Sequence, residues 1–142
     1  MGIESEFFAA TDAELQFVLA SPDGSSDDLQ SIEFKRLTDV EMATLEEALT
    51  GADSMRLIES GPPPVYDGRE DGPWISRLSK SLIAALASID DSQAAAAAVK
   101  WVETEELADW AQEDGREVID AMRQLAHHAA ASGRSVYLRV SL

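Results

Sequence analysis

The C-terminal segment, residues 135–142, alternates strictly between apolar and polar side chains. One side of the alternation is Val136, Leu138, Val140 and Leu142, and the other is Tyr137, Arg139 and Ser141. This period of two is typical of a β-strand with one buried face. A strand at a chain end frays unless it pairs with another strand, so we expect this one to be docked in a sheet.

Three other segments show strand patterns. Residues 3–9 combine Ile3 with two phenylalanines ahead of a turn, and residues 32–34 alternate between apolar and charged side chains. Residues 55–59 contain Met55, Leu57 and Ile58 between turn residues, which predicts a third, mostly buried strand. With the C-terminal strand, the chain is predicted to have three or four short strands.

Helical patterns fill most of the remaining sequence. Thr11 with Glu14, and Thr38 with Glu41, have the spacing of a capping box, in which the two side chains satisfy backbone N–H groups at a helix start. Apolar stripes at helical spacing follow both, and further stripes cover residues 78–89, 94–110 and 118–129. We therefore predict about five helices.

The order of these elements indicates the fold class. Strands and helices do not alternate regularly enough for a doubly wound parallel sheet, and no repeat of fixed period is visible. We expect an α+β fold in which a small sheet of three or four short strands, including the C-terminal one, is covered on one face by about five helices. The length of 142 residues is typical of one domain, so residues 1–142 are expected to form a single domain.

The charge of the chain limits its partners. There are 27 acidic and 11 basic residues, which gives a net charge of −16. Such a field repels nucleic-acid phosphates and anionic membranes, so we expect neither as a partner. The carboxylates serve as a solvating coat in one interpretation; in the other they imitate a nucleic acid or steer a cationic ligand. A second protein is the partner we expect, and a homo-oligomer is compatible with the sequence.

Residue types that commonly bind metals and cofactors in proteins are scarce in this sequence. There is no cysteine, and the two histidines, His127 and His128, are adjacent on a predicted helix, where they point about 100° apart and are unsuited to share one metal. No phosphate-binding, dinucleotide-binding or zinc-helix motif occurs. We expect no metal and no cofactor. Because no signal sequence and no apolar run of about 20 residues is visible, a cytoplasmic location is expected.

Trp101 and Glu105 form the first candidate site. Their spacing places them on one face of a helix, where the indole would desolvate the carboxyl and raise its pKa, as a general acid or base requires. The structural alternative is that Glu105 pairs with an arginine, Arg139 or Arg77, and orients the last helices.

The second candidate site is the loop of residues 61–74, which contains four prolines and is predicted to hold neither a helix nor a central strand. Tyr66, Arg69 and Trp74 are of the types that dominate binding hot spots. The alternative is that the two aromatic residues anchor the loop as a lid over the core.

Two family resemblances accompany these patterns. The layout of Met1-Gly2-Ile3, a helix ending at Gly51, the Gly61-Pro62 loop and a final helix leading through Gly133 into a strand resembles the YfbM-like family of uncharacterised bacterial proteins. Residues 101–107 and 136–142 are similar to small actinobacterial hypothetical proteins with a Trp-x-x-Thr-Glu-Glu core, except that Arg139 stands where that group has an aromatic residue. Neither family implies an activity; both support the fold.

The sequence therefore favours a cytoplasmic binding or protein-interaction module over an enzyme. We expect its contact surface to include the 61–74 loop and the carboxylate-rich segment 103–106. One alternative is a small hydrolase or isomerase that uses Glu105 as acid or base. Another is an immunity-type or inhibitor protein whose acidic surface covers a basic active site.

Overall fold

The computed structural model describes residues 3–20, 29–68, 70 and 72–142. Its elements in chain order are β1 (Glu4–Ala10), α1 (Asp12–Ala20), β2 (Ser31–Lys35), α2 (Asp39–Thr50), α3 (Ser54–Ser60), β3 (Tyr66–Asp67), β4 (Trp74–Arg77), α4 (Lys80–Ser88), α5 (Asp91–Val102), a 3₁₀ turn η1 (Glu105–Leu107), α6 (Gln112–Ser132) and β5 (Ser135–Ser141).

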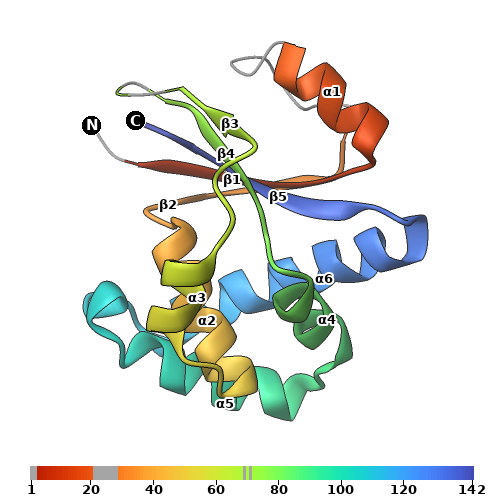
Figure 1. The fold of residues 1–142 in the computed structure, drawn as a ribbon. Coiled ribbons are helices and arrows are strands. Elements are labelled where there is room, and N and C mark those ends of the chain that lie inside the picture. Colours follow the sequence, from red (N-terminus) through yellow and green to blue (C-terminus); the bar gives the residue numbers. More distant parts are fainter. Residues whose placement is uncertain (1–2, 21–28, 69, 71) are drawn as a thin grey trace.

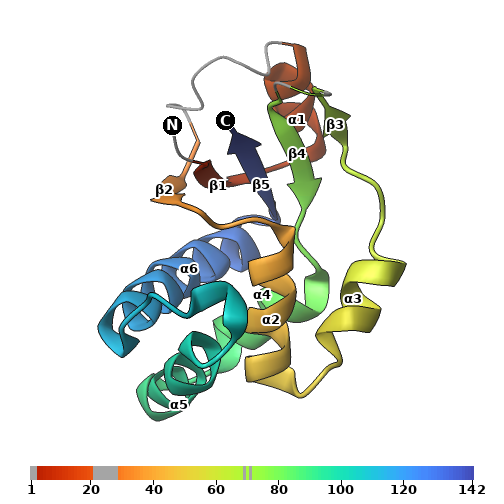
Figure 2. The ribbon, with the colours of Figure 1, turned by 90° about the vertical axis from the view of Figure 1, so that its left-hand side faces the viewer.

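The strands form one antiparallel sheet in the order β2-β1-β5-β4-β3 (Figure 1). The α+β class is confirmed, and the C-terminal alternation does form a strand, β5, at the centre of the sheet. In the described part of the chain the sheet has five strands rather than the predicted three or four. Within the described ranges, β2 and β3 are its edges (Figure 2).

Helices α2 to α6 lie on one side of the sheet, and α1 lies on the other (Figure 1). The expectation that all helices cover one face was therefore wrong for α1. Its apolar residues Leu15, Val18 and Leu19 pack against a small second core that includes Phe8 and Tyr137. Because residues of a strand alternate between faces, β1 contributes Phe7 and Ala9 to the main core and Phe8 and Ala10 to this second core.

Local signals fixed the starts and ends of several helices. Thr11 and Glu14 exchange hydrogen bonds as a capping box, with N–H to carboxylate and N–H to hydroxyl distances of 2.8 Å and 3.1 Å. The Thr38 hydroxyl instead accepts from the Val40 N–H, at 3.3 Å, and donates to Glu41. α2 and α6 end at glycines with left-handed backbone, Gly51 and Gly133.

The predicted strand at 55–59 is a helix, α3, and the prediction was wrong. Asp53 caps this helix by accepting the Met55 N–H at 3.0 Å. Its apolar residues are not buried either, since Met55 is 61% and Ile58 39% exposed. A short apolar run fits a strand and a helix equally well, and here the cap decided the outcome.

Strand β3 and Trp74, the first residue of β4, lie in the segment 61–74 that was predicted to be irregular, and neither strand was predicted. β4 lies between β3 and β5, so Trp74 belongs to an interior strand. The Gly68 N–H donates to the Pro73 carbonyl at 3.0 Å, and a Cβ on Gly68 would lie 2.4 Å from the Gly72 carbonyl carbon. Only glycine allows this close approach, which brings β3 beside β4.

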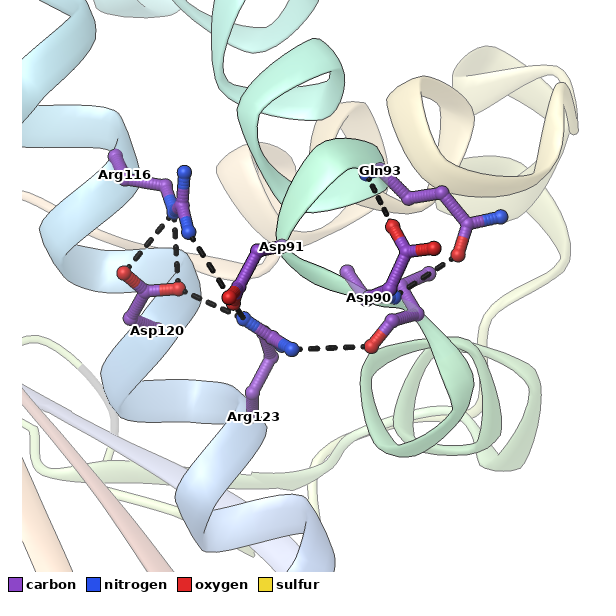
Figure 3. Close-up of polar contacts among 7 residues, drawn as sticks. Asp90, Asp91, Gln93, Arg116, Asp120 and Arg123 are labelled. Carbon is purple, nitrogen blue, oxygen red and sulfur yellow. Dashed lines mark hydrogen bonds and ion pairs between the residues drawn. The ribbon is translucent and has the colours of Figure 1, made fainter.

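Ion pairs fasten the helical layer at its surface (Figure 3). Arg123 on α6 donates to Asp91 at the start of α5 and to Asp120, both at 3.1 Å, and to the Ile89 carbonyl at the end of α4. Arg116 bonds the same two aspartates. The cluster joins three helices and is explained by this structural role.

Among the described residues, no helix is long and apolar enough to cross a membrane.

Candidate functional site

The face of the sheet that carries α1, called the outer face below, is apolar at one end and charged at the other. A row of cross-strand neighbours runs over all five strands, in the order Tyr66, Ile75, Arg139, Glu6 and Glu33. On one side of this row lies the apolar core beneath α1. On its other side lies a second row, Ser141, Glu4 and Lys35. α1 covers only the apolar end of the outer face and does not cover the charged end.

Arg139 is held at the base of this charged end by Glu6. The shortest distance between the guanidinium and the carboxylate is 2.8 Å, and the two side chains are only 15% and 11% exposed. Both residues face outward from neighbouring strands in register, so the pair follows from the β1–β5 pairing. A pocket of about 290 Å³ lies over it, lined by Glu4, Ser5, Glu6, Glu33, Phe34, Lys35, Arg139 and Ser141.

The pocket extends to the free edge of β2. Two backbone hydrogen bonds, Ala9 N–H to Gln30 O at 3.0 Å and Arg36 N–H to Ile3 O at 2.9 Å, show which residues face β1. Antiparallel strands alternate between bonded and non-bonded pairs, so residues 30, 32, 34 and 36 bond to β1. Ser31, Glu33 and Lys35 therefore direct their N–H and C=O groups away from the sheet, and no strand of the described chain pairs with them.

A second hollow, the helix-side groove, lies on the opposite face of the same edge. It measures about 360 Å³ and is lined by Phe34, Lys35, Arg36, Asp109, Trp110, Asp114, Glu117 and Val118. Phe34 and Trp110 are half-buried and form its apolar part, while Asp114 and Glu117 are exposed at the start of α6. The edge of β2 thus has one hollow on each face, and Phe34 and Lys35 line both.

Arg36 lies at the end of β2 beside this groove. Its φ of 66° is left-handed, which is uncommon for a residue other than glycine. Its guanidinium is 3.6 Å from the Asp109 carboxylate. The groove therefore already accommodates one cationic side chain of the protein itself.

The two residues of the first predicted site do not share a surface. Trp101 is fully buried, and its Nε1 donates to the Glu41 carbonyl at 3.2 Å and the Thr44 hydroxyl at 3.1 Å. α5 ends at Val102, so helical spacing no longer applies at Glu105, which is exposed in η1. The indole is part of the core and forms no wall beside this carboxyl.

The residues of the second predicted site are also separated. Tyr66 faces outward and packs against the apolar core under α1. Trp74 precedes Ile75, the cross-strand partner of Tyr66, so its side chain belongs to the opposite face of the sheet, and it lies over Gly72. Arg69 lies outside the described residues. The packing of Tyr66 against a core corresponds to the alternative in which an aromatic residue anchors the loop.

Of the predicted site residues that the structure describes, Arg139 alone lies in the charged pocket. Sequence reasoning missed Glu6, Glu33 and Glu117. Glu33 was visible as the polar partner in an alternating strand, but nothing in the sequence shows that β2 is an edge. Within the described residues, no group of three or more acidic or histidine side chains is placed to hold a metal.

The comparisons with known proteins indicate no specific function. No family model and no curated protein matches the sequence. The chain is similar to the crystal structure of YfbM, a protein of unknown function from Escherichia coli, at 16% identity and a TM-score of 0.41, covering 98% of this chain and 99% of that one. The resemblance to YfbM noted from the sequence is confirmed to this extent, and it transfers no ligand or activity.

Proposed function

We propose that this protein is an interaction module that binds an extended segment of another protein along the free edge of β2. The observation that carries the proposal is the outward direction of the backbone groups of Ser31, Glu33 and Lys35. An exposed strand edge is a template for a further strand, because the new strand satisfies those donors and acceptors.

The hollows on the two faces of this edge support the same proposal. An added strand directs successive side chains to opposite faces of the sheet, so it needs room on both. The charged pocket provides about 290 Å³ on the outer face, and the helix-side groove about 360 Å³ on the other. Main-chain hydrogen bonds would provide affinity, and these hollows would select the side chains.

The enzymatic alternative has no comparable support. Glu105 is exposed and the indole of Trp101 is buried away from it, so the tryptophan wall on which this alternative depended is not formed. The cytoplasmic location expected from the sequence stays a prediction.

The proposal is tested with peptides selected against the protein from a random nonapeptide display library. Glu33→Pro removes the outward N–H at the middle of the edge and places a ring in the path of the added strand. Residue 33 makes no ladder bond to β1, so this change leaves the β1–β2 ladder intact. We expect Glu33→Pro to abolish binding of the selected peptides and Glu33→Ala to weaken it by no more than about fivefold, as the loss of one exposed ion pair allows, with circular dichroism confirming that both are folded.

If Glu33→Pro does not fold, the same comparison uses Ser31→Pro and Ser31→Ala, since proline is tolerated at the first residue of a strand. The proposal is overturned if no peptide is selected, or if the proline and alanine variants bind the selected peptides equally well.

A further inference from the structure

We infer that the segment recognised at the β2 edge is basic and carries two adjacent Lys or Arg residues, one directed to each face of the sheet. This inference rests on the proposed function and specifies its partner. It is carried by the position of acidic side chains around the edge.

Each face of the edge has an exposed carboxylate to which no described residue is paired. Glu33 projects from β2 on the outer face, and Glu117 projects from α6 at the helix-side groove. Both are exposed, and neither forms a side-chain hydrogen bond or ion pair within the described part of the chain. Glu4 and Asp114 lie beside them in the same two hollows.

The register of an added strand connects these carboxylates to neighbouring positions of the partner. A partner residue that pairs with Glu33 directs its side chain to the outer face, toward Glu33 and Glu4. The next partner residue pairs with Phe34 and directs its side chain into the helix-side groove, toward Glu117. Adjacent basic residues therefore reach both carboxylates, whereas basic residues two positions apart reach only one face.

The helix-side groove also suits a cation by its shape and composition. Its apolar part consists of the half-buried rings of Phe34 and Trp110, and an aromatic face attracts a guanidinium or ammonium group. Arg36 lines this groove with its guanidinium 3.6 Å from Asp109, and the other carboxylates of the lining are those of Asp114 and Glu117. A long aliphatic stem against the rings, with its charge at the acidic rim, fits both features.

A basic partner is favoured over a second copy of this chain. Two copies, each with a net charge of −16, repel one another, whereas a basic segment is attracted by the same field. Pairing two β2 strands about Glu33 would also place two like charges opposite each other, which is destabilising.

The test uses two synthetic octapeptides of threonine, valine and two arginines, identical in composition. In one the arginines are adjacent, and in the other they are two positions apart; an uncharged Thr/Val octapeptide is the reference. Isothermal titration calorimetry of the whole protein at low and high salt gives the affinities. We expect the adjacent peptide to bind about two- to fivefold more tightly than the spaced one, as one further exposed ion pair allows, and to lose this advantage at high salt.

Variants assign the effect to the two carboxylates. Glu33→Gln and Glu117→Gln should each weaken the adjacent peptide by about two- to fivefold, and at most one of them should weaken the spaced peptide. Glu59→Gln on α3, away from β2 in Figure 2, is the control with the same charge change and should leave both affinities unchanged.

Three outcomes overturn the inference. They are equal binding of the two arginine peptides, equal effects of Glu33→Gln and Glu59→Gln, and self-association through β2 seen by sedimentation. If the uncharged peptide binds as well as the charged ones and Glu33→Pro still abolishes binding, the basic partner is rejected and the edge site stands. If Glu33→Pro has no effect, the proposed function itself is rejected.

Discussion

The two faces of the sheet are made by the same strands, yet they are covered differently. On the helical face, four of the five helices contribute buried residues to one continuous apolar core, in which Trp101, Ile119 and Leu86 are fully buried. On the outer face, α1 closes a small apolar core at one end, and the other end holds the Glu6–Arg139 pair below a charged pocket. The helical face thus holds most of the buried apolar residues, and the recognition that we propose lies at the β2 edge, where the open end of the outer face ends.

Truncating the largest buried side chain of the helical face should have the largest effect. Trp101→Ala removes a fully buried indole and its two hydrogen bonds, and should lower the free energy of unfolding by about 3–5 kcal/mol. Trp74→Ala, at a half-buried indole outside that core, should cost about 1 kcal/mol. Urea unfolding followed by circular dichroism measures both; equal losses would contradict the assignment of stability to the fully buried core of the helical face.

Breaking the ion pair of the outer face should have the next largest effect. Arg139→Met leaves the Glu6 carboxylate nearly buried without its cation, and should cost about 2–3 kcal/mol, less than a fully buried pair because both side chains keep some exposure. In the double variant Glu6→Gln/Arg139→Met no charge is left buried, so part of the loss should be recovered. A double-mutant cycle measures the coupling, and strictly additive losses would show that the two residues do not act as a pair.

The surface cluster of Figure 3 should contribute less. Arg123→Met removes hydrogen bonds to Asp91, Asp120 and the Ile89 carbonyl, and should lower the free energy of unfolding by about 1–2 kcal/mol. Arg56→Met, at an exposed arginine on α3, should change it by less than about 0.5 kcal/mol. Chemical denaturation distinguishes the two variants. A loss of stability in Arg56→Met as large as that in Arg123→Met would show that the hydrogen bonds of the cluster do not contribute specifically to stability.

The smallest effect concerns the attachment of α1 and depends on pH. Hydrogen bonds from Arg134, at 2.8 Å and 3.0 Å, lower the pKa of Glu14 from 4.5 to about 2, with a further contribution from Thr11. Because the folded pKa is below the unfolded one, the ionised carboxylate stabilises the fold above about pH 4.5, and this contribution is lost as the pH falls toward 2.

Glu14→Gln lacks the contribution at every pH. Its melting temperature should therefore lie below that of the wild type at pH 6, and the difference should shrink between pH 4.5 and 2. Calorimetry over this range provides the comparison. A difference that stays constant with pH would mean that the Arg134 contact does not depend on ionised Glu14.

The sequence predicts those structural features that depend on residues close together in the chain. The alternation of residues 135–142, the Thr11–Glu14 capping box and the glycine at position 51 each act over a few residues, and the structure contains all three features. The α3 segment was mistaken for a strand because its apolar run is too short to show a period. β3 and β4 were missed because their pairing depends on the close approach of Gly68 to Gly72, which composition does not reveal.

The candidate site was less accessible to such reasoning. Arg139 was selected from the sequence, but its partner Glu6 is brought to it by the pairing of the first and last strands. Trp101 and Glu105 have the spacing of one helix face, but the helix ends between them. The free edge depends on which strand is outermost in the sheet, and only the tertiary structure determines that.

The account's central claim is that β2 accepts a further strand, and amide hydrogen exchange tests it most directly. In the free protein, the outward N–H groups of Ser31, Glu33 and Lys35 should exchange faster than those of Ile32 and Phe34, which bond to β1. Addition of the peptide with adjacent arginines should slow exchange at the three outward positions and leave the other two unchanged. A bound peptide that slows exchange only in residues 61–74, or at no residue of β2, would contradict the claim.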